Sequence, residues 1–190
     1  GFAQDPDGDR LAVIDENGRA IGEDLSLGLA ALQVLRVHDS GPVVTNLSVS
    51  QAVKDKILEL GSVLYLTPTG EINVSTEMVK THAVVGGENS GGVIIPAIHP
   101  CRDSFAAMAV ILECLTTTGH SVSELVNQFK SYHLVKEKIK IRPEMAPGIL
   151  RRVRDSYLAD QMKKLDGVYV SFEDGWIQVR RSNTEPVIRI

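Results

Sequence analysis

The clearest candidate site in this chain is a run of three aspartates at alternate positions. Asp5, Asp7 and Asp9 stand in the stretch DPDGDR at residues 5–10. Two close carboxylates repel by ~1 kcal/mol in water and ~4 kcal/mol at an effective dielectric of 20, so three of them predict a compensating cation. Alternate residues of an extended segment point the same way and can converge on one ion. Ligands that are all oxygens favour the hard ions Mg²⁺ and Ca²⁺.

Two other interpretations of this acidic stretch stay open. An EF-hand calcium loop has acids at positions 1, 3 and 5, glycine at 6 and glutamate at 12. The three aspartates and Glu16 match that pattern, but Arg10 occupies the glycine position. A plain acidic surface turn is the other alternative. Arg10 favours the metal site, because a guanidinium beside a metal ion can share a phosphate with it.

A glycine-rich loop is the second candidate. The stretch GGENSGG at residues 86–92 is not a dinucleotide fingerprint, since the spacing is wrong and no helix is expected to follow it. Its four glycines let the backbone approach a ligand closely. Glu88 and Ser90 offer a carboxylate and a hydroxyl suited to gripping paired sugar hydroxyls. The alternative is a glycine-rich hairpin without a ligand. His99, in the following HPCRD, is a weaker candidate for the same site.

The third candidate is the stretch RRSNTEP at residues 180–186, between two expected strands. Arg180 supplies a forked donor, while Ser182, Asn183 and Thr184 add side-chain and backbone donors. This composition favours an anion-binding loop. An ordinary polar turn is the alternative.

The elements that must position these segments follow from the hydrophobic pattern. Strands alternate with helices over residues 24–140, which predicts a three-layer α/β domain with a mixed, mainly parallel sheet. Beyond it, one helix at 149–165 and three short strands predict a small α+β domain. No internal repeat or low-complexity tract interrupts this order.

Local signals predict several element boundaries. An Asn17-Gly18 turn predicts a hairpin in RLAVIDENGRAIGED, and no element is expected before the acidic loop. Asp24 is expected to cap the following helix, and residues 75–82 to form a brief one. The stretch Ser121-Val-Ser-Glu124 predicts a capping box.

Composition narrows the class of protein. The chain has 190 residues, of which 43% are apolar, enough for a buried core. Its net charge of −4 argues against nucleic acid as a partner. No apolar run approaches the ~20 residues of a membrane span. Two cysteines, Cys101 and Cys114, are too few for a disulfide scaffold, so we expect a cytoplasmic protein with no membrane partner.

Taken in order and spacing, DPDGDR, GGENSGG and RRSNTEP resemble the α-D-phosphohexomutases, the phosphoglucomutase/phosphomannomutase family. The resemblance covers essentially the whole chain, which we expect to be the C-terminal part of a longer protein. It implies that residues 1–22 end a second domain with the metal loop. Residues 23–140 would form the third domain with the sugar-binding loop, and residues 141–190 most of a fourth domain with the phosphate-binding loop.

The resemblance also implies roles and an activity. Asp5, Asp7 and Asp9 would hold Mg²⁺, with Arg10 beside the phosphoryl group. Glu88 and Ser90 would grip sugar hydroxyls, and the RRSNTEP donors the non-reacting phosphate. The parent would move a phosphoryl group between the 1- and 6-hydroxyls of a hexose phosphate, of the glucose or mannose type, through a phosphoserine and a hexose bisphosphate.

This chain departs from the family pattern in ways that limit those expectations. It lacks the serine loop of the type T-A-S-H-N-P, so we expect the chain by itself to be inactive. Arg181 stands where proline is common, and Cys101 where glycine of a GRD sequence is usual. A phosphoglucosamine mutase and a non-catalytic phosphosugar-binding relative stay open as alternatives. The oligomeric state is not readable from the sequence.

Overall fold

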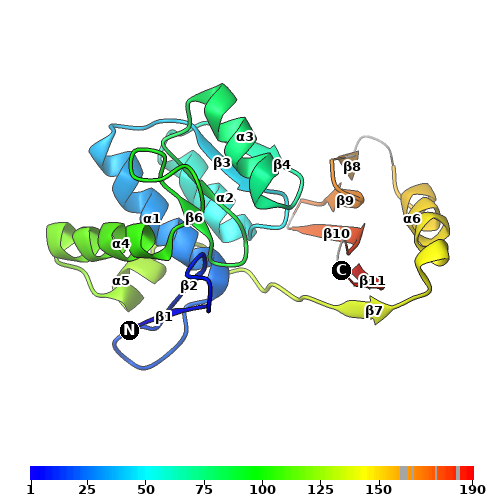
Figure 1. Ribbon diagram of the computed structural model, residues 1–190, viewed down its shortest axis with the longest axis horizontal. Helices are drawn as coiled ribbons and strands as arrows, with labels where there is room; N and C mark the ends of the chain where they lie inside the picture. Colours follow the sequence, from blue (N-terminus) through cyan, green and yellow to red (C-terminus); the bar gives the residue numbers. More distant parts are fainter. Residues whose placement is uncertain (159–161, 164, 174, 183–184) are drawn as a thin grey trace. The chain divides into compact units, whose positions relative to one another are not determined.

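The chain folds into two compact units, Gly1–Tyr132 and His133–Ile190, which are described separately below (Figure 1). The structure is a computed structural model, and it describes residues 1–158, 162–163, 165–173, 175–182 and 185–190. The first unit contains, in chain order, β1 (Phe2–Gln4), β2 (Leu11–Val13), α1 (Glu23–Val37), β3 (Val43–Asn46), α2 (Gln51–Glu59), β4 (Leu64–Thr67), α3 (Glu71–Thr81), β5 (Val85–Gly87), β6 (Val93–Ile94), α4 (Ser104–Thr118) and α5 (Val122–Val126).

The first unit is a three-layer α/β structure, as the sequence predicts. Its four-stranded sheet has the order β4-β3-β5-β6, with β3 parallel to β4 and β5, and β6 antiparallel to β5. Because side chains alternate along a strand, Val43 joins the large core under α1, α2 and α4, while Val44 joins a smaller core under α3. Figure 1 shows α4 lying beside α1 in the outer layer.

A hairpin carries the acidic stretch. Strands β1 and β2 pair antiparallel from Phe2–Val13 to Gln4–Leu11. The expectation of no element before the acidic loop is therefore wrong, because residues 2–4 gain backbone partners from β2. The predicted turn at Asn17-Gly18 is confirmed by a bridge between Ile14 and Ala20. Since Leu11 and Val13 are buried in the large core, the hairpin is part of the first unit.

Two of the predicted helix starts differ in the structure. Helix α1 has Gly22 at its N-cap, and Asp24 is instead buried and accepts a hydrogen bond from the Ser50 N–H at 3.3 Å. The helix predicted at 75–82 is α3, which begins at Glu71 because Gly70, at φ +122°, turns the chain sharply into it. The capping box at Ser121 is confirmed at the start of α5.

The second unit is a small α+β structure, as predicted. A five-stranded antiparallel sheet has the order β7-β11-β10-β9-β8. Its elements are β7 (Lys138–Lys140), a 3₁₀ turn at Pro143–Met145, α6 (Ala146–Asp155), β8 (Met162–Lys163), β9 (Val168–Ser171), β10 (Trp176–Arg181) and β11 (Val187–Arg189).

The helix predicted at 149–165 is wrong in its second half. Helix α6 ends at Asp155, and Met162 and Lys163 form a strand that pairs with β9. The apolar side chains of α6 that pack in the core of the second unit, among them Ile149, Leu150 and Val153, all precede Asp155. At residues 162–163, pairing with β9 supplies the backbone hydrogen bonds that a longer helix would otherwise make. Among the described residues, no helix combines the length and the apolar character needed to cross a bilayer.

Glu16 lies in the Asn17-Gly18 turn, between the bridged residues Ile14 and Ala20, and contacts α5. Its carboxylate accepts hydrogen bonds from the Ser123 hydroxyl and from the Ser123 N–H. The Ser123 hydroxyl, followed by the backbone N–H of Glu16 itself, lowers the pKa of Glu16 to about 2. The contact therefore stabilises the folded chain in the charged form of Glu16.

We expect the Glu16→Gln variant to melt below wild type at pH 7, with the gap closing as the pH falls from about 5 to 2. The pKa of Glu16 is lower in the folded than in the unfolded chain, where it is about 4.3. The stabilisation is thus present above the unfolded value and lost as the pH falls through the folded one. Circular dichroism melts across this range measure the gap. The Glu113→Gln variant, at an exposed position of α4, is the control. A pH-independent gap for Glu16→Gln would contradict the prediction.

Candidate functional site

The acidic loop is the connection of the β1–β2 hairpin. One carboxylate oxygen from each of Asp5, Asp7 and Asp9 lies within 4.8 Å of the others. The turn depends on Gly8, whose φ of +72° suits glycine and whose N–H donates to the Asp5 carbonyl at 3.1 Å. The Ser104 N–H and hydroxyl both donate to the Gly8 carbonyl, at 3.2 and 2.5 Å, so the start of α4 holds the loop.

Electrostatics in this loop favour a bound cation. Burial raises the pKa of Asp9, and its contact with Asp5 raises it further, although Arg102 acts in the other direction. For Asp5, burial also acts to raise the pKa, but the Arg10 N–H and the neighbouring carboxyls outweigh it and lower the pKa. Oδ1 of Asp9 is buried and makes no hydrogen bond within the described part of the chain. The loop thus offers a carboxylate oxygen with no hydrogen-bonding partner, which fits a hard cation.

Arg102 links this loop to the glycine-rich loop. Its guanidinium forms ion pairs with Asp9 Oδ2, with Glu88 Oε2 at 3.0 Å and with Glu71 Oε2 at 3.3 Å. Its backbone N–H also donates to Glu71 Oε1 at 2.8 Å. Sequence analysis missed Arg102 and singled out the exposed His99 from the same HPCRD stretch. The sequence does show an arginine shortly after the glycine-rich loop. It does not show which carboxylates this arginine will pair with.

Glu88 directly follows β5 and is buried, with 5% of its surface exposed. Groups at the end of β3 and shortly after β4 hold its carboxylate. Oε1 accepts from the Gly70 N–H at 2.7 Å and from Asn46 Nδ2 at 3.0 Å. Asn46, at the end of β3, also donates from Nδ2 to Asn89 Oδ1 at 3.2 Å. Ser90 follows in the same loop and is half-buried. Asn46 and Gly70 are therefore further site residues that the sequence motifs do not indicate.

The structure brings together the predicted metal and sugar residues of the first unit. Residues Asp9 and Glu88 lie far apart in the chain, yet both contact one guanidinium. Arg10 lies beside the same loop, with Nε 3.7 Å from Asp5 Oδ2 and 3.8 Å from Asp9 Oδ1. Its side chain is 52% exposed, so it remains accessible to an anion.

The second unit contains the predicted anion-binding loop. Arg180 follows the buried Val179 in β10, and its Nε lies 3.8 Å from Asp166 Oδ2. Ser182 is buried; its N–H donates to the Val187 carbonyl at 3.0 Å, and its hydroxyl accepts from the Glu185 N–H at 3.3 Å. Two further predicted residues, Asn183 and Thr184, lie outside the described residues.

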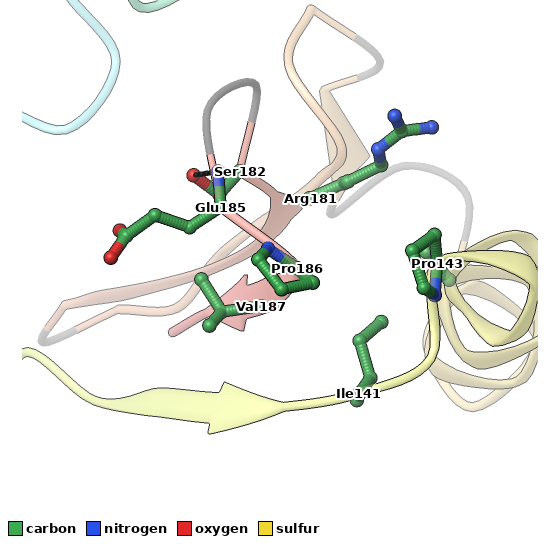
Figure 2. Close-up of a pocket in the computed structure, with 8 residues that line it drawn as sticks. Ile141, Pro143, Arg181, Ser182, Glu185, Pro186 and Val187 are labelled. Carbon is green, nitrogen blue, oxygen red and sulfur yellow. Dashed lines mark hydrogen bonds between the residues drawn. The ribbon is translucent and has the colours of Figure 1, made fainter.

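A pocket of about 260 Å³ opens beside this loop. Figure 2 shows Ser182, Glu185 and Val187 at one wall, with Ile141 and Pro143 at the other. Ser182 is the predicted phosphate residue that lines it, and Arg181 lines it as well, with its guanidinium directed away from the other lining residues in Figure 2. The pocket of the second unit is thus lined by polar residues such as Ser182 and Glu185 and by apolar residues such as Ile141 and Val187.

Comparison with known proteins agrees with this architecture. Residues 23–132 match the family model for phosphoglucomutase/phosphomannomutase alpha/beta/alpha domain III, and residues 134–190 match the model for the C-terminal domain. The chain therefore belongs to the phosphoglucomutase/phosphomannomutase family, the phosphohexomutases.

Two curated relatives show how much of a family member is present. The chain is 34% identical to a probable phosphoglucosamine mutase of Methanopyrus kandleri and 35% identical to a phosphoglucomutase/phosphomannomutase of Thermococcus kodakarensis. Each match covers 100% of this chain and 42% of the relative. The chain thus spans about two fifths of the length of the curated relatives it matches.

Solved structures give the same fold. A phosphoglucomutase/phosphomannomutase family protein of Burkholderia thailandensis aligns with a TM-score of 0.84 at 27% identity, over 100% of this chain and 41% of that one. An Aspergillus fumigatus N-acetylphosphoglucosamine mutase, solved with GlcNAc-6P and magnesium, aligns with a TM-score of 0.72 over 99% of this chain and 47% of that one. At 17% identity the second likeness shows the fold alone.

Proposed function

We propose that this chain supplies the metal-, sugar- and phosphate-binding segments of a phosphohexomutase. The longer protein would move a phosphoryl group between the 1- and 6-hydroxyls of a hexose phosphate of the glucose or mannose type. A serine outside this chain would carry the phosphoryl group, and a hexose bisphosphate would be the intermediate. The observation that carries the proposal is the meeting of the acidic loop and the glycine-rich loop at Arg102.

Asp5, Asp7 and Asp9 would hold Mg²⁺. Their clustered oxygens and the Asp9 oxygen without a hydrogen bond among the described residues fit a hard cation. The Aspergillus mutase was solved with magnesium, which makes Mg²⁺ a plausible ion for the family. When bound, the ion would neutralise negative charge on the transferring phosphoryl group.

The remaining work falls to positioning by the chain's own side chains. Glu88, held from three sides, would accept hydrogen bonds from sugar hydroxyls with its unused lone pairs, and Ser90 would add a hydroxyl. Arg10, partly exposed beside the acidic loop, would pair with the transferring phosphoryl group. The non-reacting phosphate would lie on the loop formed by Arg180, Ser182, Asn183 and Thr184.

The domain organisation follows the same proposal. Residues 1–22 would end the domain that precedes the α/β/α domain, which is supported by a family-model match that begins at residue 23. Residues 23–140 would carry the sugar loop, and residues 141–190 the phosphate loop.

The isolated chain is expected to bind phosphosugar weakly and to be inactive. Four charge-assisted hydrogen bonds contribute ~6–12 kcal/mol. Association costs of ~4–15 kcal/mol nearly cancel this gain, so we expect millimolar affinity or weaker. Calorimetry that gave micromolar binding of glucose 1-phosphate would contradict the expectation.

Phosphoglucosamine mutase is the second candidate function, and it is favoured by the name of the Methanopyrus kandleri relative. A non-catalytic phosphosugar-binding relative is the third. Assays of the full-length parent against glucose, mannose and glucosamine phosphates separate them. Turnover of glucosamine phosphate alone would favour the phosphoglucosamine mutase. If none of the three sugar phosphates were turned over, the non-catalytic relative would be favoured.

We expect Mg²⁺ to raise the melting temperature of the chain and the Asp7→Asn variant to lose that effect. At an ion concentration ~20 times the dissociation constant, binding stabilises by about 1.8 kcal/mol. For a chain of this size that corresponds to roughly 5 °C. Differential scanning calorimetry with Mg²⁺ and with Ca²⁺ measures it, and Glu113→Gln is the control variant. Equal shifts in wild type and Asp7→Asn would place the ion elsewhere, and a strong preference for Ca²⁺ would favour a calcium site.

A further inference from the structure

The side chain of Arg102 occupies a space that a glycine leaves open. A Cβ atom built at Gly92 would collide with Cδ of Arg102 and approach Cγ at 3.0 Å. The last glycine of GGENSGG therefore makes room for the stem of Arg102. As a result the Arg102 side chain is only 14% exposed, and its guanidinium contacts carboxylates of both loops.

The planar fork of Arg102 contacts the two loops with different nitrogens. Nη2 pairs with Asp9 Oδ2, and Nη1 pairs with Glu88 Oε2 at 3.0 Å. Glu71 holds the Nε side of the guanidinium at 3.3 Å and the backbone N–H at 2.8 Å. A lysine ammonium is a point charge without this fork, so it would not hold both carboxylates in the same geometry.

The contact with Arg102 also decides which Asp9 oxygen is left for a ligand. Oδ2 is engaged by Arg102, while the buried Oδ1 makes no hydrogen bond with any described group. Rotation of the carboxylate would break the ion pair. With Oδ2 held by Arg102, Oδ1 is the Asp9 oxygen without a hydrogen bond among the described residues, in a loop where one oxygen from each of Asp5, Asp7 and Asp9 lies within 4.8 Å of the others.

We propose that Arg102 is a positioning residue, which fixes Asp9 for the cation and couples the acidic loop to the sugar-gripping Glu88. This inference rests on the metal site proposed above. Partners of metal-binding carboxylates typically change metal affinity 10–100-fold when removed. Through the shared guanidinium, occupancy at the acidic loop and the position of Glu88 become linked, and such linkage is reciprocal.

Arg102 and Arg10 both lie beside the acidic loop, but we expect their removal to affect Mn²⁺ affinity differently. The Arg102→Met variant loses the partner of Asp9, and we expect it to bind Mn²⁺ about 10–100-fold more weakly. The Arg102→Lys variant keeps the charge but not the fork, and should recover only part of this loss. Arg10 lies at ion-pair distance without a hydrogen bond from its guanidinium to Asp9 in the described structure. Arg10→Met removes a positive charge but no hydrogen bond to Asp9, so we expect it not to weaken Mn²⁺ binding.

The test is a double-mutant cycle between Arg102 and Glu88, with metal affinity as the readout. The full 190-residue chain is titrated with Mn²⁺, and free Mn²⁺ is measured by electron paramagnetic resonance. Glu88→Gln should weaken Mn²⁺ binding by about 3-fold in the wild-type background and have no effect in Arg102→Met, since the coupling passes through the guanidinium. Circular dichroism checks that each variant is folded, and Arg102→Lys replaces Arg102→Met in the cycle if the latter unfolds.

The outcomes separate this inference from the proposed metal site. Weakening by Arg102→Met, no weakening by Arg10→Met, and an effect of Glu88→Gln that depends on Arg102 support the inference. Mn²⁺ binding that is lost in Asp7→Asn but unchanged in Arg102→Met overturns the role of Arg102 alone. Equal effects of Glu88→Gln in both backgrounds overturn the coupling. A wild-type chain that binds no Mn²⁺ overturns the metal site and this inference with it.

Discussion

Replacing Glu88 with alanine is expected to destabilise the first unit by about 3 kcal/mol, a fall of roughly 10 °C in melting temperature. The carboxylate is buried and accepts from the Gly70 N–H, Asn46 Nδ2 and Arg102 Nη1. Alanine leaves the Gly70 donor without its partner, and each buried donor left unsatisfied costs ~1–3 kcal/mol. In this variant Arg102 still forms its ion pairs with Asp9 and Glu71, so it contributes less to the destabilisation than a guanidinium left without any partner would.

The Glu88→Gln variant is the matched comparison for this prediction. Its amide oxygen can still accept from Gly70 and Asn46, while its charge is gone. We expect Glu88→Gln to lose about half as much stability as Glu88→Ala, because only the contact with Arg102 turns from attractive to repulsive. Urea unfolding of both variants measures the difference. A loss below 1 kcal/mol for Glu88→Ala would contradict a buried carboxylate that accepts three hydrogen bonds.

The second large effect is expected at Gly91. Its φ is +86°, and a Cβ added there would lie 2.6 Å from the carbonyl oxygen of Leu11. The Leu11 N–H donates to the Gly91 carbonyl at 3.0 Å, so the glycine-rich loop and β2 lie in direct backbone contact. Alanine adds the left-handed backbone penalty of ~1–2 kcal/mol and forces the two backbones apart. We expect Gly91→Ala to lose about 3 kcal/mol in total.

Gly119 offers a control that has the backbone strain without the collision. It ends α4 at φ +70°, and a Cβ there would meet no described atom within 4 Å. Gly119→Ala should therefore lose only the ~1–2 kcal/mol of the left-handed conformation. Chemical denaturation of the two variants, side by side, measures the difference. If they were equally destabilised, the contact between the loop and β2 would have no energetic weight.

The sequence gives a correct account of the features that depend on local chemistry. Alternating strands and helices predict the mixed, mainly parallel sheet, which β3, β4, β5 and β6 form. The turn at Asn17-Gly18 and the capping box at Ser121 are confirmed because neighbouring residues alone determine them. The motif trio identifies the family, which the matching family models show.

Sequence analysis is wrong about the end of α6 and the N-cap of α1, where residues outside these helices supply hydrogen-bonding partners. The helical pattern at 149–165 continues past Asp155, but β9 captures residues 162–163 as a strand. Asp24 has the residue type of an N-cap, yet its oxygen accepts from Ser50 instead. In both cases a hydrogen bond from another element competes with the local preference and wins.

By itself, the sequence determined the α/β architecture, the family and the three segments that hold carboxylates, hydroxyls and anion donors. The architecture follows from the hydrophobic period, which acts over a few residues, and the family from the resemblance of three short motifs in their order and spacing. Only the tertiary structure decided that Arg102 lies between Asp9 and Glu88, and that Asn46 and Gly70 hold the other side of Glu88. Nothing local to an arginine specifies which carboxylates will surround it, because packing of the hairpin, the sheet and α4 sets those distances.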